Sequence, residues 1–210
     1  MLKSVILPNN NQLELTPLTI LTGVNNSGKT TILKRIAALP NTEYVNTNRE
    51  QLITPHNVQK SVNKWLNRMG LENLKGAGAR HVFPILTAGT QLKPKQTLII
   101  ENPEIFLHPK NQMKLADFFI SLVNKNRQVI IETHGDHIIN RVLRRVLECE
   151  TEFLLNATTV YFLEQSSIKE IEMDRVGGIR EAPEDFFGQF ADETGHIISA
   201  GLDNIKRGNK

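Results

Sequence analysis

The chain has 210 residues, of which 40% are hydrophobic and 22% are charged, and its formal net charge is +3. This length and composition predict one globular domain with a sizeable core and exclude a wholly disordered chain. No stretch approaches the roughly 18 consecutive apolar residues of a membrane span, and the start of the chain lacks a signal-peptide pattern. The single cysteine, Cys149, excludes an internal disulfide and argues against a structural zinc site, so we expect a cytoplasmic protein.

Positive charge is concentrated in the first half of the chain. Residues 1–110 carry 13 Lys or Arg against 6 Glu and no Asp, whereas residues 111–210 carry 12 against 16 acidic residues. A basic half is typical of a surface that faces the phosphates of a nucleotide or of nucleic acid. An unevenly charged solvated surface has the same composition, so both interpretations stay open.

Predicted strands and helices alternate along the first half. Short strands are expected at Lys3–Leu7, Gln12–Leu15, Pro17–Thr22 and Thr97–Ile100. Helices are expected at Lys29–Leu39, Val58–Met69 and Ala79–Leu92. The polar stretch Asn41–Ile53 shows neither period and is predicted to be irregular.

The second half continues the alternation. Helices are predicted at Pro109–Lys125, which begins with a proline, and at Asp136–Leu147. A buried strand is expected at Gln128–Ile131, a hairpin at Thr159–Leu163 and Ile168–Asp174, and two weaker helices near Pro183–Phe190 and Glu193–Lys206. This order predicts an α/β fold with a mostly parallel sheet, flanking helices and antiparallel strands at its ends. On Asp136–Leu147, the residues Arg141, Arg144 and Arg145 point outward, either toward phosphates or into solvent.

The segment Gly23–Thr30 fits the phosphate-loop pattern G-x-x-x-x-G-K-[ST] at every fixed position. A predicted strand precedes it and a predicted helix follows, as the motif requires. The glycines let the backbone N–H groups wrap phosphate oxygens, Lys29 places a charge between the β- and γ-phosphates, and Thr30 can bind Mg²⁺. The expected ATP-binding residues are Gly23, Asn25, Asn26, Ser27, Gly28, Lys29, Thr30 and Thr31.

A phosphate loop also needs a carboxylate for the metal at the end of a buried strand. No aspartate occurs before Asp117, but the strand Thr97–Ile100 runs directly into Glu101. Thr30 and Glu101 are therefore the predicted Mg²⁺ ligands.

Four stretches resemble ABC-type ATPase heads, the class that includes SMC and Rad-type DNA-repair ATPases. They are similar, more closely, to the AAA/ABC-like ATPases of the OLD (overcoming lysogenization defect) group and related bacterial proteins. Leu15–Thr31 resembles the opening strand and Walker A, Thr97–Pro109 the Walker B and Leu-His-Pro, and Val129–Asn140 the switch-histidine segment. A weaker likeness lies in Ile179–Phe187.

The resemblance implies an ABC-like P-loop NTPase fold and a homodimer with two ATP molecules sandwiched between subunits. It implies Lys29 and Thr30 on phosphate and Mg²⁺, Glu101 on Mg²⁺, and His134 as sensor of the γ-phosphate. A head at residues 1–175 and a helical tail at 176–210 are expected. The implied partners are a protein effector or nuclease subunit and, through that complex, nucleic acid, with antiviral defence or DNA repair as the setting and no membrane.

The tail contains Phe186, Phe187 and Phe190, whose spacing suits one helix face. We expect this segment either to dock a partner or to bury at least two of these rings in the protein's own core.

Three departures from the family pattern bear on activity. Arg80 stands where a serine would contact γ-phosphate across the dimer, either as an arginine finger or in a signature that has lost its role. Asn102 replaces the catalytic glutamate, so it can only orient a water, and Glu104 becomes the candidate base. The chain is also short for the family, and Gln51 and Gln59 are only candidates for the Q-loop glutamine.

Other nucleotide and metal chemistries fit less well. A GTPase base reader would need an aspartate that Asn124–Arg127 lacks, and no arginine-rich lid of a kinase is evident. His134 and His137 have no His-x-His partner for a metal hydrolase, and no nuclease carboxylate cluster follows residue 140. Two hypotheses remain: a slow ATPase, or a non-hydrolysing ATP-bound scaffold or regulatory subunit.

Overall fold

The structure is a computed structural model that describes residues 1–7, 11–49, 56–72, 76–165 and 167–174. Beyond residue 174 it describes only residues 179, 180, 183, 186, 197 and 199. The two weaker helices predicted in the tail therefore lie almost wholly outside the described residues. None of the described helices is long and apolar enough to cross a membrane.

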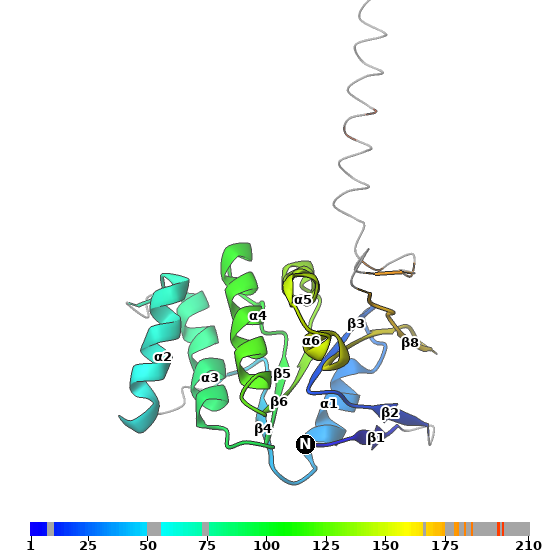
Figure 1. Cartoon of the computed structure of the whole chain (residues 1–210), viewed down its shortest axis with the longest axis horizontal. Coiled ribbons are helices and arrows are strands. Elements are labelled where there is room, and N and C mark those ends of the chain that lie inside the picture. Colours follow the sequence, from blue (N-terminus) through cyan, green and yellow to red (C-terminus); the bar gives the residue numbers. More distant parts are fainter. Residues whose placement is uncertain are drawn as a thin grey trace, which may run out of the picture.

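A six-stranded sheet in the order β4-β5-β6-β3-β7-β8 forms the centre of the molecule (Figure 1). Its strands are β3 (Leu18–Gly23), β4 (Thr42–Val45), β5 (Thr97–Glu101), β6 (Gln128–Glu132), β7 (Thr158–Leu163) and β8 (Ile168–Glu170). All neighbours are parallel except β8, which pairs antiparallel with β7. This arrangement confirms the predicted α/β class, the mostly parallel sheet and the hairpin at its end.

A small antiparallel sheet lies beside the large one. It consists of β1 (Ser4–Ile6) and β2 (Gln12–Glu14), the two short strands predicted at the start of the chain, which pair antiparallel with each other. Its apolar side chains Val5 and Leu13 share a core with Leu33 of α1 (Lys29–Ala37) and with Ile99 and Ile130 of the large sheet. The small sheet and α1 therefore cover the same face of the large sheet.

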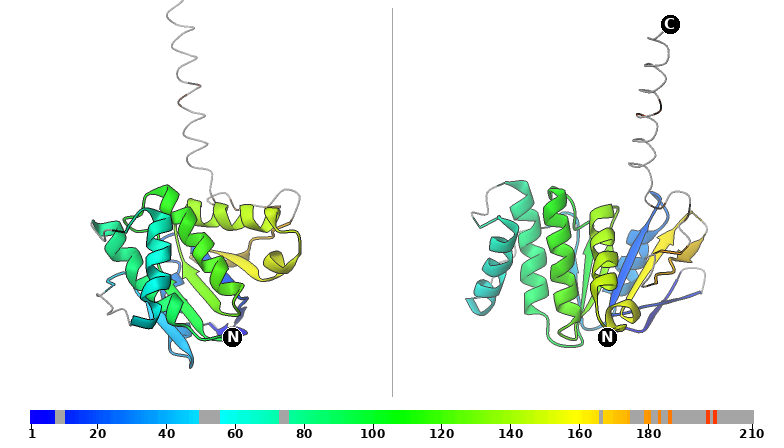
Figure 2. Two further views of the ribbon diagram at one scale, coloured as in Figure 1. Left: turned by 60° about the vertical axis from the view of Figure 1, so that its left-hand side comes forward. Right: turned by 45° about the horizontal axis from the view of Figure 1, so that its top comes forward.

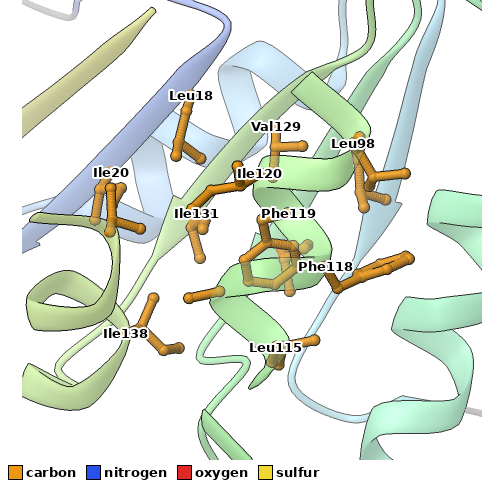
Figure 3. Close-up of a cluster of buried hydrophobic side chains, with 14 of the residues drawn as sticks. Leu18, Ile20, Leu98, Leu115, Phe118, Phe119, Ile120, Val129, Ile131 and Ile138 are labelled. Carbon is orange, nitrogen blue, oxygen red and sulfur yellow. The ribbon is translucent and has the colours of Figure 1, made fainter. Parts of the chain in front are cut away.

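The other face is covered by a layer of helices (Figure 2). This layer contains α2 (His56–Met69), α3 (Ala77–Gln91), α4 (Pro109–Val123) and α5 (Asp136–Glu148), and the short α6 (Phe153–Asn156) leads into β7. Phe118 and Phe119 of α4 pack there against Leu98, Val129 and Ile131 (Figure 3). Because alternate residues of β5 and β6 face opposite layers, both strands are buried along their whole length and have continuous apolar middles, Leu98–Ile100 and Val129–Ile131.

Three predictions of local structure are wrong or incomplete. Asn41–Ile53 is predicted to be irregular, but its residues Thr42–Val45 form β4, an edge strand paired with β5. Four residues among polar neighbours show no period, and only pairing with β5 makes them a strand. Helix α3 begins two residues earlier than predicted, so Pro84 lies in its interior, and α6 is absent from the sequence prediction.

Candidate functional site

The phosphate loop joins β3 to α1 at the carboxyl end of the parallel strands. Gly23 has φ +123, and a Cβ there would lie 2.1 Å from the Leu163 carbonyl oxygen of β7. Gly28 has φ +89 and stands immediately before the first residue of α1. Only glycine fits both positions easily, so this sequence builds a tight loop whose N–H groups precede a helix N-terminus.

The side chain of Lys29 is buried at the mouth of this loop, with 3% exposure. Its Nζ donates to the carbonyl oxygens of Gly23, at 3.0 Å, and Val24, at 2.6 Å. Burial lowers the pKa of Lys29, and Glu132 acts in the opposite direction. The ammonium is therefore held by weak neutral acceptors at the place where phosphate oxygens would be stronger ones.

The hydroxyl of Thr30 donates to both carboxylate oxygens of Glu132, at 2.8 and 2.9 Å. Glu132 ends β6, the strand next to β3, and is 4% exposed. Burial is the main reason why the pKa of Glu132 is raised, and the nearby carboxylates of Glu101 and Glu104 also raise it. The hydrogen bond from Thr30 and the charge of Lys29 act in the opposite direction. Glu132 is not among the ligands predicted from the sequence, although it ends a strand with an apolar middle just as Glu101 does.

Glu101 lies one strand further from the loop, in register with Glu132. Its carboxylate accepts hydrogen bonds from the Tyr44 hydroxyl and from the N–H and hydroxyl of Thr47, at 3.2 and 3.1 Å. These partners belong to β4 and the segment after it. Among the described contacts, Thr30 is bonded to Glu132 and Glu101 to the β4 side, so the two predicted metal ligands are not in direct contact.

Glu104 holds the segment that follows β6. Its carboxylate accepts hydrogen bonds from the Thr133 hydroxyl and from the His134 N–H, both at 2.8 Å. His134 is exposed and lines the same hollow as the phosphate loop. Partial desolvation lowers the pKa of His134, Lys29 lowers it further, and Glu104 raises it. The neutral imidazole expected beside Lys29 can donate or accept a hydrogen bond at phosphate.

Arg49 fixes the turn after β5, a contact that the sequence analysis missed. Its guanidinium donates to the carbonyl oxygens of Glu101 and Asn102, at 2.7 and 2.8 Å, and lies 3.1 Å from Nδ1 of His81. Asn102 has φ +42, and its Oδ1 is buried without a hydrogen-bond partner among the described residues. Burial lowers the pKa of Arg49 to about 10, although Glu104 and Glu101 act against this shift. No local pattern connects Arg49 to residues more than fifty positions away.

Arg80 lies in the first turn of α3 and is exposed. It does not line the hollow beside its own phosphate loop, and Figure 1 shows α3 and α1 on opposite faces of the sheet. The start of α3 packs closely on the turn after β5, since a Cβ on Gly78 would lie 2.6 Å from the Phe106 carbonyl oxygen. The structure thus places Arg80 on a different surface from Lys29.

Two hollows flank the phosphate loop. One of about 650 Å³ is lined by the loop together with Glu132 and His134. The other, of about 410 Å³, shares Asn26, Ser27, Gly28 and Thr31 and continues to three apolar side chains, Leu7 directly after β1, Ile32 of α1 and Ile168 of β8. All eight predicted ATP-binding residues except Gly23, which bonds Lys29, line one or both of these hollows.

The two remaining candidates that the structure describes, Gln59 and Phe186, do not line these hollows. Gln59 is bonded to Asn63 on α2, whereas Gln51 lies outside the described residues. Phe186 packs edge-on against Phe162 with ring centroids 5.7 Å apart, which confirms burial for one of the three tail phenylalanines. Phe187 and Phe190 are not among the described residues.

The donor set at the loop suits Mg²⁺. This ion prefers oxygen ligands and keeps several waters, so it needs only one or two protein oxygens besides nucleotide phosphates. Thr30 and Glu132 supply such oxygens in direct contact. The described residues contain no group of three or more His, Cys, Asp or Glu that would hold a metal without a nucleotide.

Comparison with known proteins supports the α/β fold described above and the binding of ATP. A family model described as an AAA ATPase domain matches residues 55–139, which include β5, β6 and His134 but not the phosphate loop. No curated protein matches the sequence.

Two solved structures are similar in fold to about three quarters of this chain. One, described as a metal-chelate type ABC transporter in an inward-facing conformation, has a TM-score of 0.50 at 15% identity, over 78% of this chain and 74% of that chain. The other, an ATP-binding cassette of an ABC transporter in its ADP conformation, has a TM-score of 0.52 at 14% identity, over 77% and 83%. The chain has the α/β fold of P-loop NTPases in its ABC-ATPase-like form, and the AAA ATPase match supports ATP binding.

Proposed function

We propose that this chain is an ATP-binding head that hydrolyses ATP slowly and closes around it as a homodimer. The contact between Thr30 and Glu132 beside the buried Lys29 carries this proposal. A chance glycine-rich loop would not bring a buried lysine, a hydroxyl and a buried carboxylate together at a helix N-terminus. Phosphate binding uses this combination of a cation, N–H groups and a metal site.

The two hollows suggest how the nucleotide is held. The larger hollow, with Lys29, Glu132 and His134, suits the polyphosphate. The adjoining hollow, with its apolar side chains beside Glu164 and Ser167, suits the nucleoside. No Phe, Tyr or Trp ring among the described residues lines either hollow, so the base would be held by apolar contact and hydrogen bonds.

Mg²⁺ bound with the nucleotide would neutralise phosphate charge, with Thr30 and either Glu132 or Glu101 as its protein ligands. Glu132 already contacts Thr30, whereas Glu101 lies one strand away. His134 would orient the terminal phosphate, and Glu104 keeps the backbone of His134 in place.

The groups that would activate water favour slow turnover. Asn102 cannot accept a proton, and both oxygens of Glu104 are engaged by Thr133 and His134. The same observation favours a second candidate function, a non-hydrolysing ATP-bound scaffold or regulatory subunit. A phosphate-release assay on the purified chain separates the two, because only the first produces phosphate above the rate of ATP alone.

Nucleotide binding is tested by replacing Lys29 with alanine. The loss of a charged contact to phosphate should weaken Mg-ATP binding by roughly 2–4 kcal/mol, or about 30- to 1,000-fold. Affinity for a fluorescent ATP analogue measures this effect. The control is Lys34→Ala, which removes an exposed lysine from the same helix and should leave the affinity unchanged. Equal affinity for Lys29→Ala and the native chain would contradict the proposal.

The assembly of this head is part of the same proposal. A phosphate loop binds one side of the nucleotide, and Arg80, on a separate surface, is suited to reach the γ-phosphate of a second copy. The ABC-ATPase-like fold supports such a homodimer. The proposed biological setting, an OLD-like head serving an effector or nuclease subunit in antiviral defence or DNA repair, follows from the motif resemblance.

A further inference from the structure

A positively charged groove lies where α2 passes α4, away from the phosphate loop. It is a hollow of about 330 Å³ lined by Lys64 and Arg68 of α2, by Lys125 and Arg127 after α4, and by Trp65. Its other lining residues are Ser61, Thr90, Phe118, Ser121 and Leu122, so no acidic side chain of the described part of the chain lines it. We call this hollow the basic groove.

The exposed side of α2 extends the groove as a stripe of basic side chains. His56, Lys60, Lys64 and Arg68 follow one another at intervals of four residues, and all are exposed. The opposite side of the helix is buried, and α2 contains no acidic residue. Four residues correspond to about 6 Å along a helix, so the stripe is a gently inclined row of regularly spaced donors.

These cations lack acidic partners in the described part of the chain. No described salt bridge involves Lys60, Lys64, Arg68, Lys125 or Arg127. The arginines of α5 are different, since Arg141, Arg144 and Arg145 are all paired with carboxylates. Arg127 bonds only the Leu92 carbonyl oxygen, at 2.7 Å, and burial lowers its pKa. Holding uncompensated cations together is electrostatically unfavourable unless an anion joins them.

We propose that the basic groove and the α2 stripe bind the sugar–phosphate backbone of a nucleic acid strand. A regular polyanion matches a regular row of cations, and its affinity comes mainly from such phosphate contacts. Ser61 and Ser121 line the groove, and Asn63 and Asn67 stand beside the stripe. Hydroxyl and amide side chains of this kind are common donors to phosphate oxygens.

An acidic protein segment is the competing ligand, and the surface suits it less. Protein interfaces rely on buried apolar or aromatic anchors within a polar rim. None of the exposed large hydrophobic residues of the described chain lies on α2 or in the groove. Trp65 itself is half-buried, packed edge-on against Phe118 and covered by the Arg68 guanidinium at 4.8 Å.

The groove and the nucleotide site are separate. They share no lining residue, and the groove belongs to the helical layer on the face of the sheet opposite α1. The proposed strand binding therefore requires neither ATP nor Lys29, and it can be tested independently of the proposed ATPase.

Trp65 provides a direct reading of this surface because it is the only tryptophan of the chain. Full-length protein is titrated with a fluorescein-labelled oligothymidine of about 20 nucleotides at low salt, without ATP. The anisotropy of the label and the fluorescence of Trp65 are both recorded. We expect binding in both signals, with affinity that falls steeply as salt is raised. Binding without a change at Trp65 would place the strand elsewhere and overturn the assignment.

The decisive variant replaces Lys60, Lys64 and Lys125 with glutamine. Each lost phosphate contact reduces the salt slope by about 0.7 for a single strand, so the triple variant should lose about two units of slope and at least about tenfold in affinity at low salt. The matched control replaces the exposed Lys3, Lys34 and Arg35 with glutamine as well, which removes the same charge far from the groove. An equal loss in the control would show that net charge alone drives binding and would overturn the proposal.

Two further outcomes would also overturn it. One is the absence of oligothymidine binding at about 100 μM protein, since non-specific nucleic acid binding falls in or below this range. The other is equal affinity for a polyglutamate peptide of about 20 residues that is lost in the same triple variant, which would identify the groove as a site for acidic protein segments. Lys29→Ala should bind the oligonucleotide like the native chain, so failure of the ATPase proposal leaves this test unaffected.

Discussion

At the scale of single residues, two glutamates with the same local sequence pattern have different surroundings. Glu101 and Glu132 each end a buried parallel strand and face each other in register across β5 and β6. Glu132 contacts the phosphate-loop hydroxyl of Thr30, whereas Glu101 is held by Tyr44 and Thr47 on the β4 side. These contacts therefore favour Glu132 over Glu101 as a carboxylate ligand of the proposed Mg²⁺ site, with Glu101 organising the strand edge beside it.

The two roles can be separated by glutamine substitutions. Glu132→Gln should remove most of the gain in ATP affinity that Mg²⁺ provides, about tenfold or more, because an amide oxygen is a weaker ligand than a carboxylate. Glu101→Gln should retain most of that gain. The measurement is ATP-analogue affinity with Mg²⁺ and with a chelator.

The pH dependence gives an additional test. Because its folded pKa is raised, Glu132 keeps its proton to higher pH than an unperturbed glutamate. The Mg²⁺-dependent gain should therefore increase as pH rises through this pKa, and Glu132→Gln should lack that increase. The opposite result would be a complete loss of the Mg²⁺-dependent gain in Glu101→Gln and an unchanged gain in Glu132→Gln. It would support the metal role that the sequence alone predicts for Glu101.

At the scale of elements, a cluster of ion pairs joins α4 to α5. Asp117 of α4 accepts hydrogen bonds from Arg141, at 3.0 and 2.7 Å, and from Arg145, at 2.8 and 3.4 Å. The interpretation of these outward arginines as phosphate ligands is thus not supported for the isolated chain. They connect the two helices that pack over β3 and β6, and so indirectly support the His134 segment that precedes α5.

Removing the charge of Asp117 should weaken this connection. Asp117→Asn should lower the free energy of unfolding by about 1–3 kcal/mol, since two partly buried guanidinium groups lose their acceptor. Urea denaturation near neutral pH measures the effect. The control is Arg144→Gln, whose pairing with Glu148 is exposed and should contribute less than about 1 kcal/mol.

The ion pairs of Asp117 with Arg141 and Arg145 also predict how the free energy of unfolding depends on pH. Burial would raise the pKa of Asp117, but its hydrogen bonds to Arg141 and Arg145 outweigh burial and hold the pKa below its usual value of 3.8. Its stabilising effect is therefore present above the pKa of the unfolded chain and is lost as pH falls through the lower folded value. The difference between native chain and Asp117→Asn should shrink in acid, and a constant difference would contradict this account.

At the scale of the whole molecule, the strand order separates the phosphate loop from the start of α3. The loop follows β3, near the middle of the sheet, while Gly76–Arg80 packs on the turn after β5, beside the β4 edge. The two proposed phosphate-binding surfaces of one chain are therefore apart. In a two-fold dimer, the phosphate loop of each copy could then face the Arg80 surface of the other copy.

Arg80→Ala tests whether this separation serves an intermolecular site. We expect ATP binding by the monomer to be unchanged, whereas self-association induced by Mg-ATP should fall about tenfold or more in sedimentation experiments. Arg80→Lys should recover only part of it, because lysine keeps the charge but not the two-pronged geometry. A native chain that stays monomeric with Mg-ATP would contradict the homodimer, and an unaffected Arg80→Ala dimer would exclude Arg80 from it.

The sequence by itself determined the features that arise from neighbouring residues. These features are the glycines of the phosphate loop, the proline that begins α4 and the continuous apolar runs within β5 and β6. They act through local sterics, hydrogen bonding and burial, so they can be recognised from the sequence alone. The tertiary structure decided which residues meet: that Thr30 contacts Glu132, that Arg49 holds the turn after β5, and that Thr42–Val45 becomes a strand. These contacts depend on strand order, since two apolar strands that both end in glutamate are equivalent until the fold places β6, and not β5, beside β3.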